Sequence, residues 1–464
     1  MTEASETTHR HKIFNLSAIT DMTQILPKSA SNESILSTTS YHRRRKYINK
    51  NLPLKLFIIG MVLLYLDLVR NAYMTKEEAL ILPYIVAIII KLSIIILFGA
   101  SAGFAYLYGQ SKNIKPIYRM WLYLIFIHVL FLTFYGILRG NGIREIILDF
   151  GLFMMMFAAI LAGSNKNNWL FFDKFIVTFF FLNTVLTIIS FFDILQGEIF
   201  NPYTSGHVFS SKFYYFWGEL SIWPYFLLTI RDGSLFRKIV AYTGITTFFV
   251  SSIILSKRSP FIILFLLISV IVFKTMIQMN WIMKFKQLSG NIVRLLIFGI
   301  ILIIVIFGLG IHVYMGDTIE KLEERFFVGG SISESVLQDP RIEHDSELVF
   351  GRFSDWELLF GQGGGAMAGV PDPGAVGERS NNNDYVLHNG MLFIIQKGGI
   401  LFLMIWIMGW FHFVKDFFII KNTFLNRYFA PASVIFLFSF VTGFMGWGTD
   451  FPFLMMIAGR GMIR

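Results

Sequence analysis

The sequence contains no cysteine, and this absence excludes disulfide bridges, thiolate metal sites and cysteine nucleophiles. Charged residues are also scarce: Asp, Glu, Lys and Arg make up 15% of the 464 residues, whereas soluble globular proteins carry about 25%. Apolar residues take their place, with 55% hydrophobic and 17% aromatic residues and a mean hydropathy of +0.61. These proportions predict an integral membrane protein.

Several catalytic motifs are missing as well. The chain has no Asp-x-Asp, no His-Glu-x-x-His and no Gly-x-Ser-x-Gly pattern, so the sequence does not favour metal-dependent or serine-hydrolase chemistry. The glycine-rich run 361–365 lacks the Gly-Lys-Ser/Thr of a Walker loop. We therefore expect a protein that needs neither a metal ion nor a cofactor.

Long apolar runs recur along the chain, and each has about the 17–25 residues with which a helix crosses a bilayer. We place twelve of them, which predicts an all-α, polytopic bundle of transmembrane helices with both termini on one side of the membrane. The predicted spans cover roughly residues 53–69, 80–109, 119–137, 145–162, 174–193, 213–230, 239–255, 260–279, 294–313, 390–412, 429–446 and 450–460.

The distribution of charge orients this bundle. The net charge of +10 comes from short linkers such as Arg43–Lys46, whereas the long connection Gly316–His388 holds fourteen Asp and Glu residues against five Lys and Arg. Basic linkers remain on the cytoplasmic side of a membrane protein, so both termini are predicted to be cytoplasmic and the long loop to face outward. The same distribution argues against nucleic acid as a partner.

The chain thus divides into a tail, two groups of spans and one long loop. The polar, Ser/Thr-rich tail is expected to be disordered and cytoplasmic. The loop is expected to contain short helices at Asp317–Phe327 and Ser354–Phe360, the second with Ser354 as a possible N-cap. The predicted bounds are 1–50 for the tail, 51–313 for spans one to nine, 314–389 for the loop and 390–464 for the last three spans.

Two arginines on the outward side could bind an anion, because a guanidinium binds phosphate oxygens in pairs and keeps its proton. Arg258 lies in a short outward hairpin, where it could equally anchor the hairpin at the lipid headgroups. Arg352 precedes Trp356 by four residues, a helical spacing that would put both on one face. The alternative for Arg352 is a surface cation stacked on Trp356 or paired with Asp355 or Glu357.

The loop contains two further candidate elements. Gly361 and Gly363 belong to a glycine run that could bring backbone N–H groups close to an anion, or could simply form a flexible turn. His388 stands where the loop meets a span, with Asn389 after it and Asp384 about one helical turn before it. Histidine titrates near neutral pH, so His388 is a candidate general base or proton shuttle; the alternative is a polar cap on the span.

Four motifs in this order resemble the bacterial O-antigen polymerase and O-antigen ligase superfamily. They are a Ser-x-Arg hairpin, an Arg-x3-Trp pair, a Leu-Phe-Gly-x-Gly turn, and a His-Asn pair followed by a glycine. In this chain they are Ser256–Arg258, Arg352 with Trp356, Leu359–Gly363, and His388–Asn389 with Gly399.

The resemblance implies a glycosyltransferase of the bacterial inner membrane, with the long loop in the periplasm. Its donor would be a glycan linked to undecaprenyl diphosphate, bound through Arg258 and Arg352. Its acceptor would be the next lipid-linked repeat unit or lipid A core, with the hydroxyl deprotonated by His388. The reaction would invert the anomeric centre without a metal, among membrane lipids and with a chain-length regulator as a possible protein partner.

Three functions follow from these observations. The leading hypothesis is a polymerase of O-antigen or capsule-type polysaccharide, because Phe402 stands where the ligase pattern has Gly or Thr. The second is an O-antigen ligase, which transfers the finished glycan to lipid A core in lipopolysaccharide. The third is a flippase or transporter of lipid-linked glycan, which would place polar residues near the middle of the bilayer, where Lys91 interrupts a span.

Overall fold

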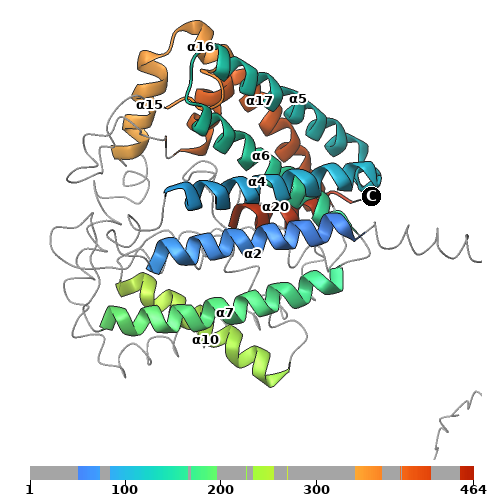
Figure 1. Ribbon diagram of the computed structural model, residues 1–464, viewed down its shortest axis with the longest axis vertical. Helices are drawn as coiled ribbons and strands as arrows, with labels where there is room; N and C mark the ends of the chain where they lie inside the picture. Colours follow the sequence, from blue (N-terminus) through green and yellow to red (C-terminus); the bar gives the residue numbers. More distant parts are fainter. Residues whose placement is uncertain are drawn as a thin grey trace, which may run out of the picture. The chain divides into compact units, whose positions relative to one another are not determined.

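The chain is described by a computed structural model over residues 51–73, 84–165, 169–195, 226, 234–254, 269, 340–367, 387, 389–419 and 450–463 (Figure 1). Most of these residues are helical and none of them belongs to a strand; Ile114 and Ile463 form an isolated antiparallel bridge. The prediction of an all-α fold is therefore confirmed for the part of the chain that the structure describes. The helices, in chain order, are α2 (Leu52–Tyr73), α4 (Tyr84–Leu107), the 3-10 helix η1 (Gln110–Asn113), α5 (Pro116–Leu138), α6 (Ile143–Gly163), α7 (Trp169–Leu195), α10 (Leu235–Ile254), α15 (Pro340–Arg352), α16 (Asp355–Phe360), α17 (Gly390–Ile419) and α20 (Asp450–Gly461).

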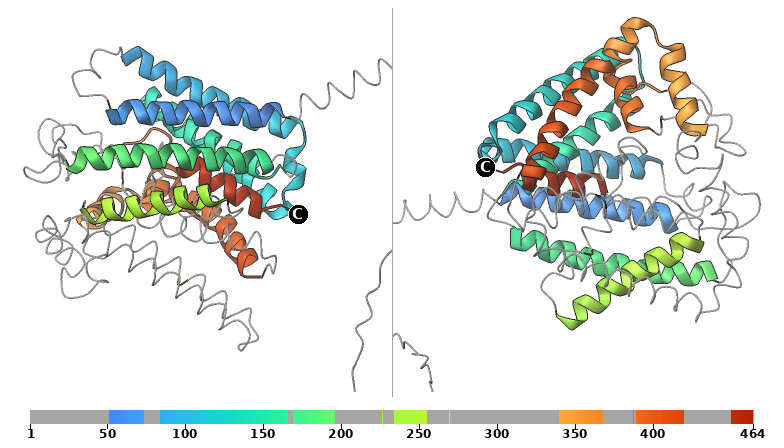
Figure 2. Two further views of the ribbon diagram at one scale, coloured as in Figure 1. Left: turned by 90° about the horizontal axis from the view of Figure 1, so that it is seen from below. Right: turned by 180° about the vertical axis from the view of Figure 1, so that it is seen from behind.

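The core of the bundle forms around α6. This helix packs against α4, α5 and α20, while α2 packs against α4. Every residue of α6 from Gly151 to Gly163 is buried, as expected for a helix that is apolar on all sides. On the other side of α2, the Tyr65 hydroxyl donates a hydrogen bond of 2.7 Å to Asn183 Oδ1 of α7. Helix α7 in turn packs against α10 (Figure 2).

Helices α5 and α17 form a second, antiparallel pair. Three indole rings, from Trp121, Trp406 and Trp410, pack together with centroids 5.9–6.2 Å apart. Trp121 Nε1 also donates a hydrogen bond of 2.9 Å to the Ile405 carbonyl. At the end of the pair where α5 begins, Lys115 forms an ion pair of 2.5 Å with Asp416, which also accepts a hydrogen bond from Tyr118. The opposite end carries the loop helices.

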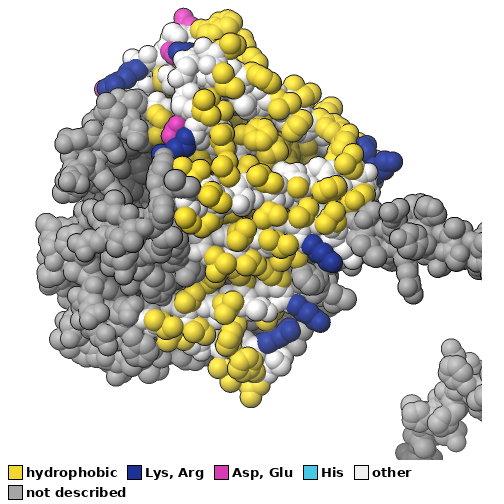
Figure 3. Space-filling view, viewed as in Figure 1, with side chains coloured by type: hydrophobic (Ala, Val, Ile, Leu, Met, Phe, Trp, Pro, Cys, Tyr) yellow, Lys and Arg dark blue, Asp and Glu magenta, His cyan; other side chains and the backbone are white. Residues whose placement is uncertain are grey.

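Four of the described helices are long and apolar enough to cross a membrane: α4 over Ile88–Leu107, and α5, α6 and α17 over their full lengths. A further apolar stretch, Lys174–Ile189, lies in α7. One side of α5 exposes large apolar residues along its whole length, among them Ile127, Phe134 and Leu138. Apolar side chains cover the face shown in Figure 3, with Lys and Arg at its borders. Such a surface fits hydrocarbon rather than water.

Eight of the predicted spans coincide with helices. Spans 119–137 and 145–162 correspond to α5 and α6, which begin and end within three residues of the predicted bounds. The spans predicted near 53–69, 80–109, 174–193, 239–255, 390–412 and 450–460 correspond to α2, α4, α7, α10, α17 and α20. The other four, near 213–230, 260–279, 294–313 and 429–446, lie outside the described residues except for the single positions 226 and 269. The number of spans therefore stays a prediction.

Two helices of the long loop, α15 and α16, are described, and both lie at the end of the bundle where α5 ends and α17 begins (Figures 1 and 2). Helix α15 packs against α17, and so does the short helix α16. The predicted helix Ser354–Phe360 is confirmed as α16 with Ser354 as its N-cap, whereas α15 was not predicted. The predicted helix Asp317–Phe327 and the tail 1–50 lie outside the described residues.

Candidate functional site

The segment from Arg352 to Trp356 is broken into two helices. Arg352 is the last residue of α15, and Ser354 begins α16 with a capping box: its hydroxyl accepts from the Glu357 N–H, and the Glu357 carboxylate accepts from the Ser354 N–H. The two side chains therefore do not share one helical face, and that prediction is wrong. Trp356 is instead 61% exposed and packs on Phe360, with ring centroids 4.2 Å apart. The strong N-cap at Ser354 overrides the helical spacing.

Helix α16 is tied to the end of α5 by an ion pair. Arg139 Nη2 lies 2.8 Å from Glu357 Oε1, and Arg139 Nη1 donates a longer hydrogen bond to the Tyr135 hydroxyl. Burial raises the pKa of Glu357, but hydrogen bonds from Ser354 and Arg139 outweigh this effect and hold the pKa below its ordinary value. Glu357 is therefore an ionised tether of the loop and is not available to Arg352.

The glycine run 361–365 forms a turn that is bonded to the helices beneath it. Four consecutive N–H groups donate to protein acceptors at 2.7–2.9 Å. Asn141 Nδ2 supports the same turn by donating to the carbonyls of Gln362 and Gly364. The turn therefore uses these N–H groups to bind the bundle, and they are not free to bind an anion. The donors Gln362, Gly363, Gly364 and Gly365 pair in order with the carbonyls of Gln396, Lys397 and Leu132 and with Asp149 Oδ2.

Glycine is required in this turn for steric reasons. Gly361 has a φ of +77°, which L side chains rarely adopt, and a Cβ there would lie 2.4 Å from the Lys397 carbonyl carbon. The partner position on α17 is Gly399, with a φ of +70°, where a Cβ would lie 2.1 Å from the Leu359 carbonyl oxygen. The two backbones touch directly, so the glycines of the motif serve a close contact between loop and helix.

Gly399 also divides α17 into two helical segments, because its backbone angles are not helical. The break releases carbonyl groups at the end of the first segment, and the Gln396 and Lys397 carbonyls accept from the glycine turn. Phe402 lies just past the break, fully buried, with its ring stacked on His128 of α5 at a centroid distance of 4.6 Å. A larger residue than Gly or Thr at position 402 therefore fills the space between α17 and α5.

A buried ion pair holds the turn from below. Lys397 Nζ lies 2.9 Å from Asp149 Oδ2 of α6 and donates a 2.5 Å hydrogen bond to the Ala366 carbonyl. The Lys397 side chain is only 4% exposed, and that of Asp149 is 19% exposed. Because Asp149 also accepts from the Gly365 N–H, one lysine and one aspartate connect two membrane helices with the loop. Ionisable residues within spans are rare, and here the pair is satisfied by its own hydrogen bonds.

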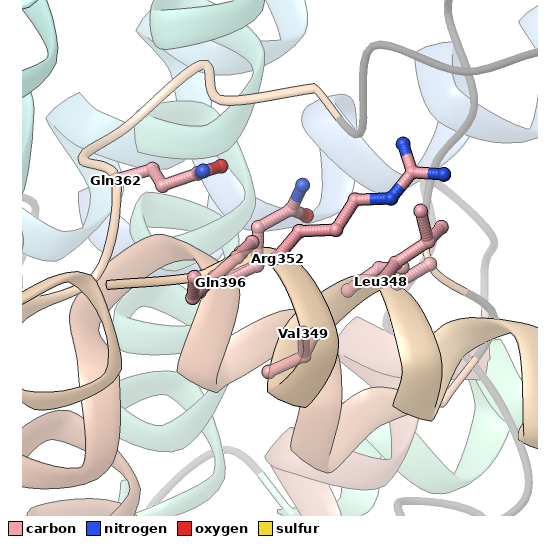
Figure 4. A pocket seen from close by; sticks show the side chains of 7 residues that line it. Leu348, Val349, Arg352, Gln362 and Gln396 are labelled. Atoms are coloured by element: carbon pink, nitrogen blue, oxygen red, sulfur yellow. The ribbon is translucent and has the colours of Figure 1, made fainter. Parts of the chain in front are cut away.

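Arg352 lines a pocket of about 150 Å³ between α15, the glycine turn and the start of α17. In the view of Figure 4, the polar ends of Arg352, Gln362 and Gln396 lie above the side chains of Leu348 and Val349. Among the described residues no carboxylate forms an ion pair with Arg352, and its side chain lines the pocket. The remaining lining residues are Phe353 and Leu387.

Leu387 connects this pocket with the predicted catalytic residue, because it precedes His388 in the chain. Asn389, which follows His388, donates its N–H to Asp345 Oδ2 of α15 at 2.9 Å. Its side-chain Oδ1 accepts from the Met391 and Leu392 N–H groups and so caps α17. Both chain neighbours of His388 are therefore fixed beside α15, the helix that ends in Arg352.

The remaining predicted site residues lie outside the described residues: Arg258, Asp384 and His388 itself. The described residues bring Arg352, Gly361, Gly363 and Asn389 to one end of the bundle, with Trp356 exposed beside them. No group of three or more His, Asp or Glu side chains that could hold a metal ion occurs among the described residues.

Sequence reasoning missed four residues of this region: Arg139, Asp149, Gln396 and Lys397. The available signal was that Gln396 and Lys397 are polar residues near the start of an apolar span, next to Gly398 and Gly399. Asp149 likewise interrupts the apolar run of α6. Polar residues in spans are expected to face protein partners, but the sequence does not show which helices face each other.

Comparison with known proteins gives no match: no family model, no curated protein and no solved structure is similar to this chain. A functional interpretation therefore depends on the order of the motifs and on the geometry of the pocket.

Proposed function

We propose that this protein is a membrane glycosyltransferase that polymerises a surface polysaccharide of the O-antigen or capsule type. It transfers a growing glycan from undecaprenyl diphosphate to the next lipid-linked repeat unit at the periplasmic face of the inner membrane. One observation carries the proposal: Arg352 lines the same pocket as Leu387, the residue directly before His388. An anion-binding group and a candidate base thus belong to one small region of the chain.

The proposed glycosyl transfer needs few protein groups beyond the arginines and the histidine. The leaving group is a lipid diphosphate, which needs charge stabilisation more than protonation. Arg352, together with Arg258, supplies that stabilisation through paired hydrogen bonds to phosphate oxygens. Neutral His388 accepts the proton of the attacking sugar hydroxyl. Direct displacement forms the new glycosidic bond, breaks the bond to the diphosphate and inverts the anomeric carbon, without a metal.

The topology that we propose has twelve spans, cytoplasmic termini and a periplasmic loop. Its support is the charge at the two ends of α5. The end where α5 begins is basic, with Lys112, Lys115 and Arg119 close together in sequence, as the positive-inside rule expects of a cytoplasmic end. The end where α5 finishes carries Arg139, but this cation is paired with Glu357 of α16, whose first turn also contains Asp355.

A strain that lacks this gene tests the proposal through its surface glycan. Loss of a polymerase leaves lipid A core bearing a single repeat unit, and this is the expected result. Uncapped core with long glycan still on the carrier would indicate a ligase instead. Short lipid-linked units retained on the cytoplasmic side would indicate a flippase, and either outcome would overturn the proposal.

Complementation of that strain then tests the site. We expect His388→Ala to abolish polymer formation, and Arg258→Lys and Arg352→Lys to shorten or abolish the glycan, because a lysine does not replace a bidentate guanidinium. Arg119→Lys, at the basic end of α5, is the matched control and should restore normal glycan. Normal glycan length in all three site variants would contradict the assignment.

A further inference from the structure

The pocket beside Arg352 contains a buried hydrogen-bond acceptor that has no donor among the residues that the structure describes. Gln396 of α17 is 1% exposed, and its side chain lines the pocket (Figure 4). No described residue donates a hydrogen bond to Gln396 Oε1. Buried polar atoms almost always have a partner, and an exception at a cavity wall indicates a group that binds there.

The charges and dipoles around Gln396 restrict what that group can be. An accepting amide oxygen disfavours an anion at this point, and the Arg352 guanidinium in the same pocket disfavours a cation. A neutral donor remains, which means a hydroxyl or an amide N–H. The amide of Gln362 is oriented by a 3.4 Å hydrogen bond that its Nε2 donates to Glu357 Oε1. The pocket thus offers neutral acceptors beside one fixed positive charge.

The apolar lining residues of the pocket and its volume further restrict the kind of ligand that it can bind. Leu348, Val349, Phe353 and Leu387 give the pocket an apolar side, which suits the C–H face of a sugar ring. Pockets for drug-sized ligands measure about 300–1,000 Å³, whereas this one has about 150 Å³. It therefore has room for a single pyranose ring and not for an oligosaccharide.

We propose that Gln396 is a specificity-determining residue whose Oε1 accepts a hydrogen bond from a hydroxyl or N-acyl N–H of one sugar ring. That ring is the sugar attached directly to the diphosphate that Arg352 binds. The pocket therefore recognises the first sugar of the lipid-linked glycan. The inference rests on the proposed function, because it assigns the Arg352 anion to the lipid carrier. Gln396 acts on substrate choice and takes no part in bond breaking.

The test measures binding to the purified full-length protein in lipid nanodiscs, with two probes that differ only in the sugar. One probe is undecaprenyl diphosphate, and the other is the lipid-linked repeat unit extracted from the strain that lacks the gene. The variants are Gln396→Met, which keeps the side-chain length without the amide, and Arg352→Ala. Gln110→Met, at a buried glutamine of η1 near the other end of α5, is the matched control.

We expect Gln396→Met to weaken binding of the glycan-bearing lipid by about three- to tenfold, the usual effect of one neutral hydrogen bond, and to leave undecaprenyl diphosphate unaffected. Arg352→Ala should weaken both probes, and Gln110→Met neither. Because the two affinities are compared within each variant, a loss of folded protein cancels from their ratio.

Two results would contradict the inference, and they are distinguishable from failure of the proposed function. An unchanged affinity ratio in Gln396→Met, with the wild type binding both lipids, would mean that only water occupies the acceptor. An equal loss for both probes would mean that Gln396 acts on the shape of the pocket alone. Failure of the folded wild type to bind either lipid would instead overturn the proposed function on which the inference rests.

Discussion

Gly399 interrupts α17 where the glycine turn crosses it, and both sides of this contact are backbone. Gly361 and Gly399 each have a positive φ, and at each of them a Cβ would overlap the opposite chain. The Gln362 and Gly363 N–H groups then satisfy carbonyls that the break releases. At the residue scale, therefore, the glycines of the motif hold the loop on the bundle rather than cradle a phosphate.

This contact predicts a position-dependent effect of alanine. Gly361→Ala should lower the melting temperature of the purified protein and expose the loop to protease, because alanine in the left-handed region costs about 1–3 kcal/mol before the clash with Lys397 is counted. Gly351→Ala is the matched control: its Cβ would meet only Glu347 Cγ at 3.7 Å inside α15, so it should stabilise the helix slightly. Equal melting temperatures for the two variants would contradict this role.

The role of a residue could be predicted from the sequence only where its partners are close to it in the chain. Ser354 was predicted as an N-cap from its own position, and the structure confirms the cap. The roles of Asp149, Lys397 and Gln396 could not be predicted, because each depends on a residue more than thirty positions away or on a cavity wall. Hydropathy shows that a polar residue lies in a span but not what it faces.

At the scale of elements, an ion pair connects each end of α17 to a neighbouring helix, and one of the two pairs is much more buried than the other. The end beside the loop has Lys397 with Asp149, where the lysine side chain is 4% exposed. The other end has Lys115 with Asp416, with side chains 28% and 29% exposed. Burial determines how much stability is lost when each pair is broken. Breaking a buried pair leaves a buried charge without a partner, whereas a solvent-exposed pair contributes little to stability.

Substituting the two lysines should therefore give unequal losses of stability. Lys397→Met should destabilise the protein by about 3–5 kcal/mol, because Asp149 is left charged in a largely apolar setting. The double variant Lys397→Met with Asp149→Asn should recover part of that loss. Lys115→Met should cost less than about 1 kcal/mol. Thermal unfolding in one detergent compares all three, and equal losses for the two single variants would refute the burial argument.

The elements themselves were predictable to different degrees. Apolar runs located α5 and α6 closely, because length and hydropathy determine a span. Helix α15 was missed because its residues Pro340–Arg352 have a polar average composition and lie in a long loop. The break between α15 and α16 was missed because helical spacing alone joined Arg352 to Trp356. A capping residue competes with such periodicity and here prevails.

At the scale of the whole molecule, the absence of cysteine becomes useful. A membrane-impermeant maleimide will react only with an introduced thiol, so single variants report the side of the membrane directly. Trp356→Cys in α16 should be labelled from the periplasm, whereas Lys112→Cys in η1 should be labelled only after the inner membrane is opened. Ile127→Cys, on the apolar face of α5, should resist labelling from either side. Labelling of Trp356→Cys only from the cytoplasm would reverse the topology.

The most direct test of the central claim is polymerisation by the purified full-length protein in vesicles that contain lipid-linked repeat units and EDTA. The account predicts a ladder of longer lipid-linked glycans with release of undecaprenyl diphosphate. It also predicts that Arg352→Ala loses this activity while Arg119→Lys keeps it. No chain extension by folded wild-type protein, or equal extension by Arg352→Ala, would contradict the account.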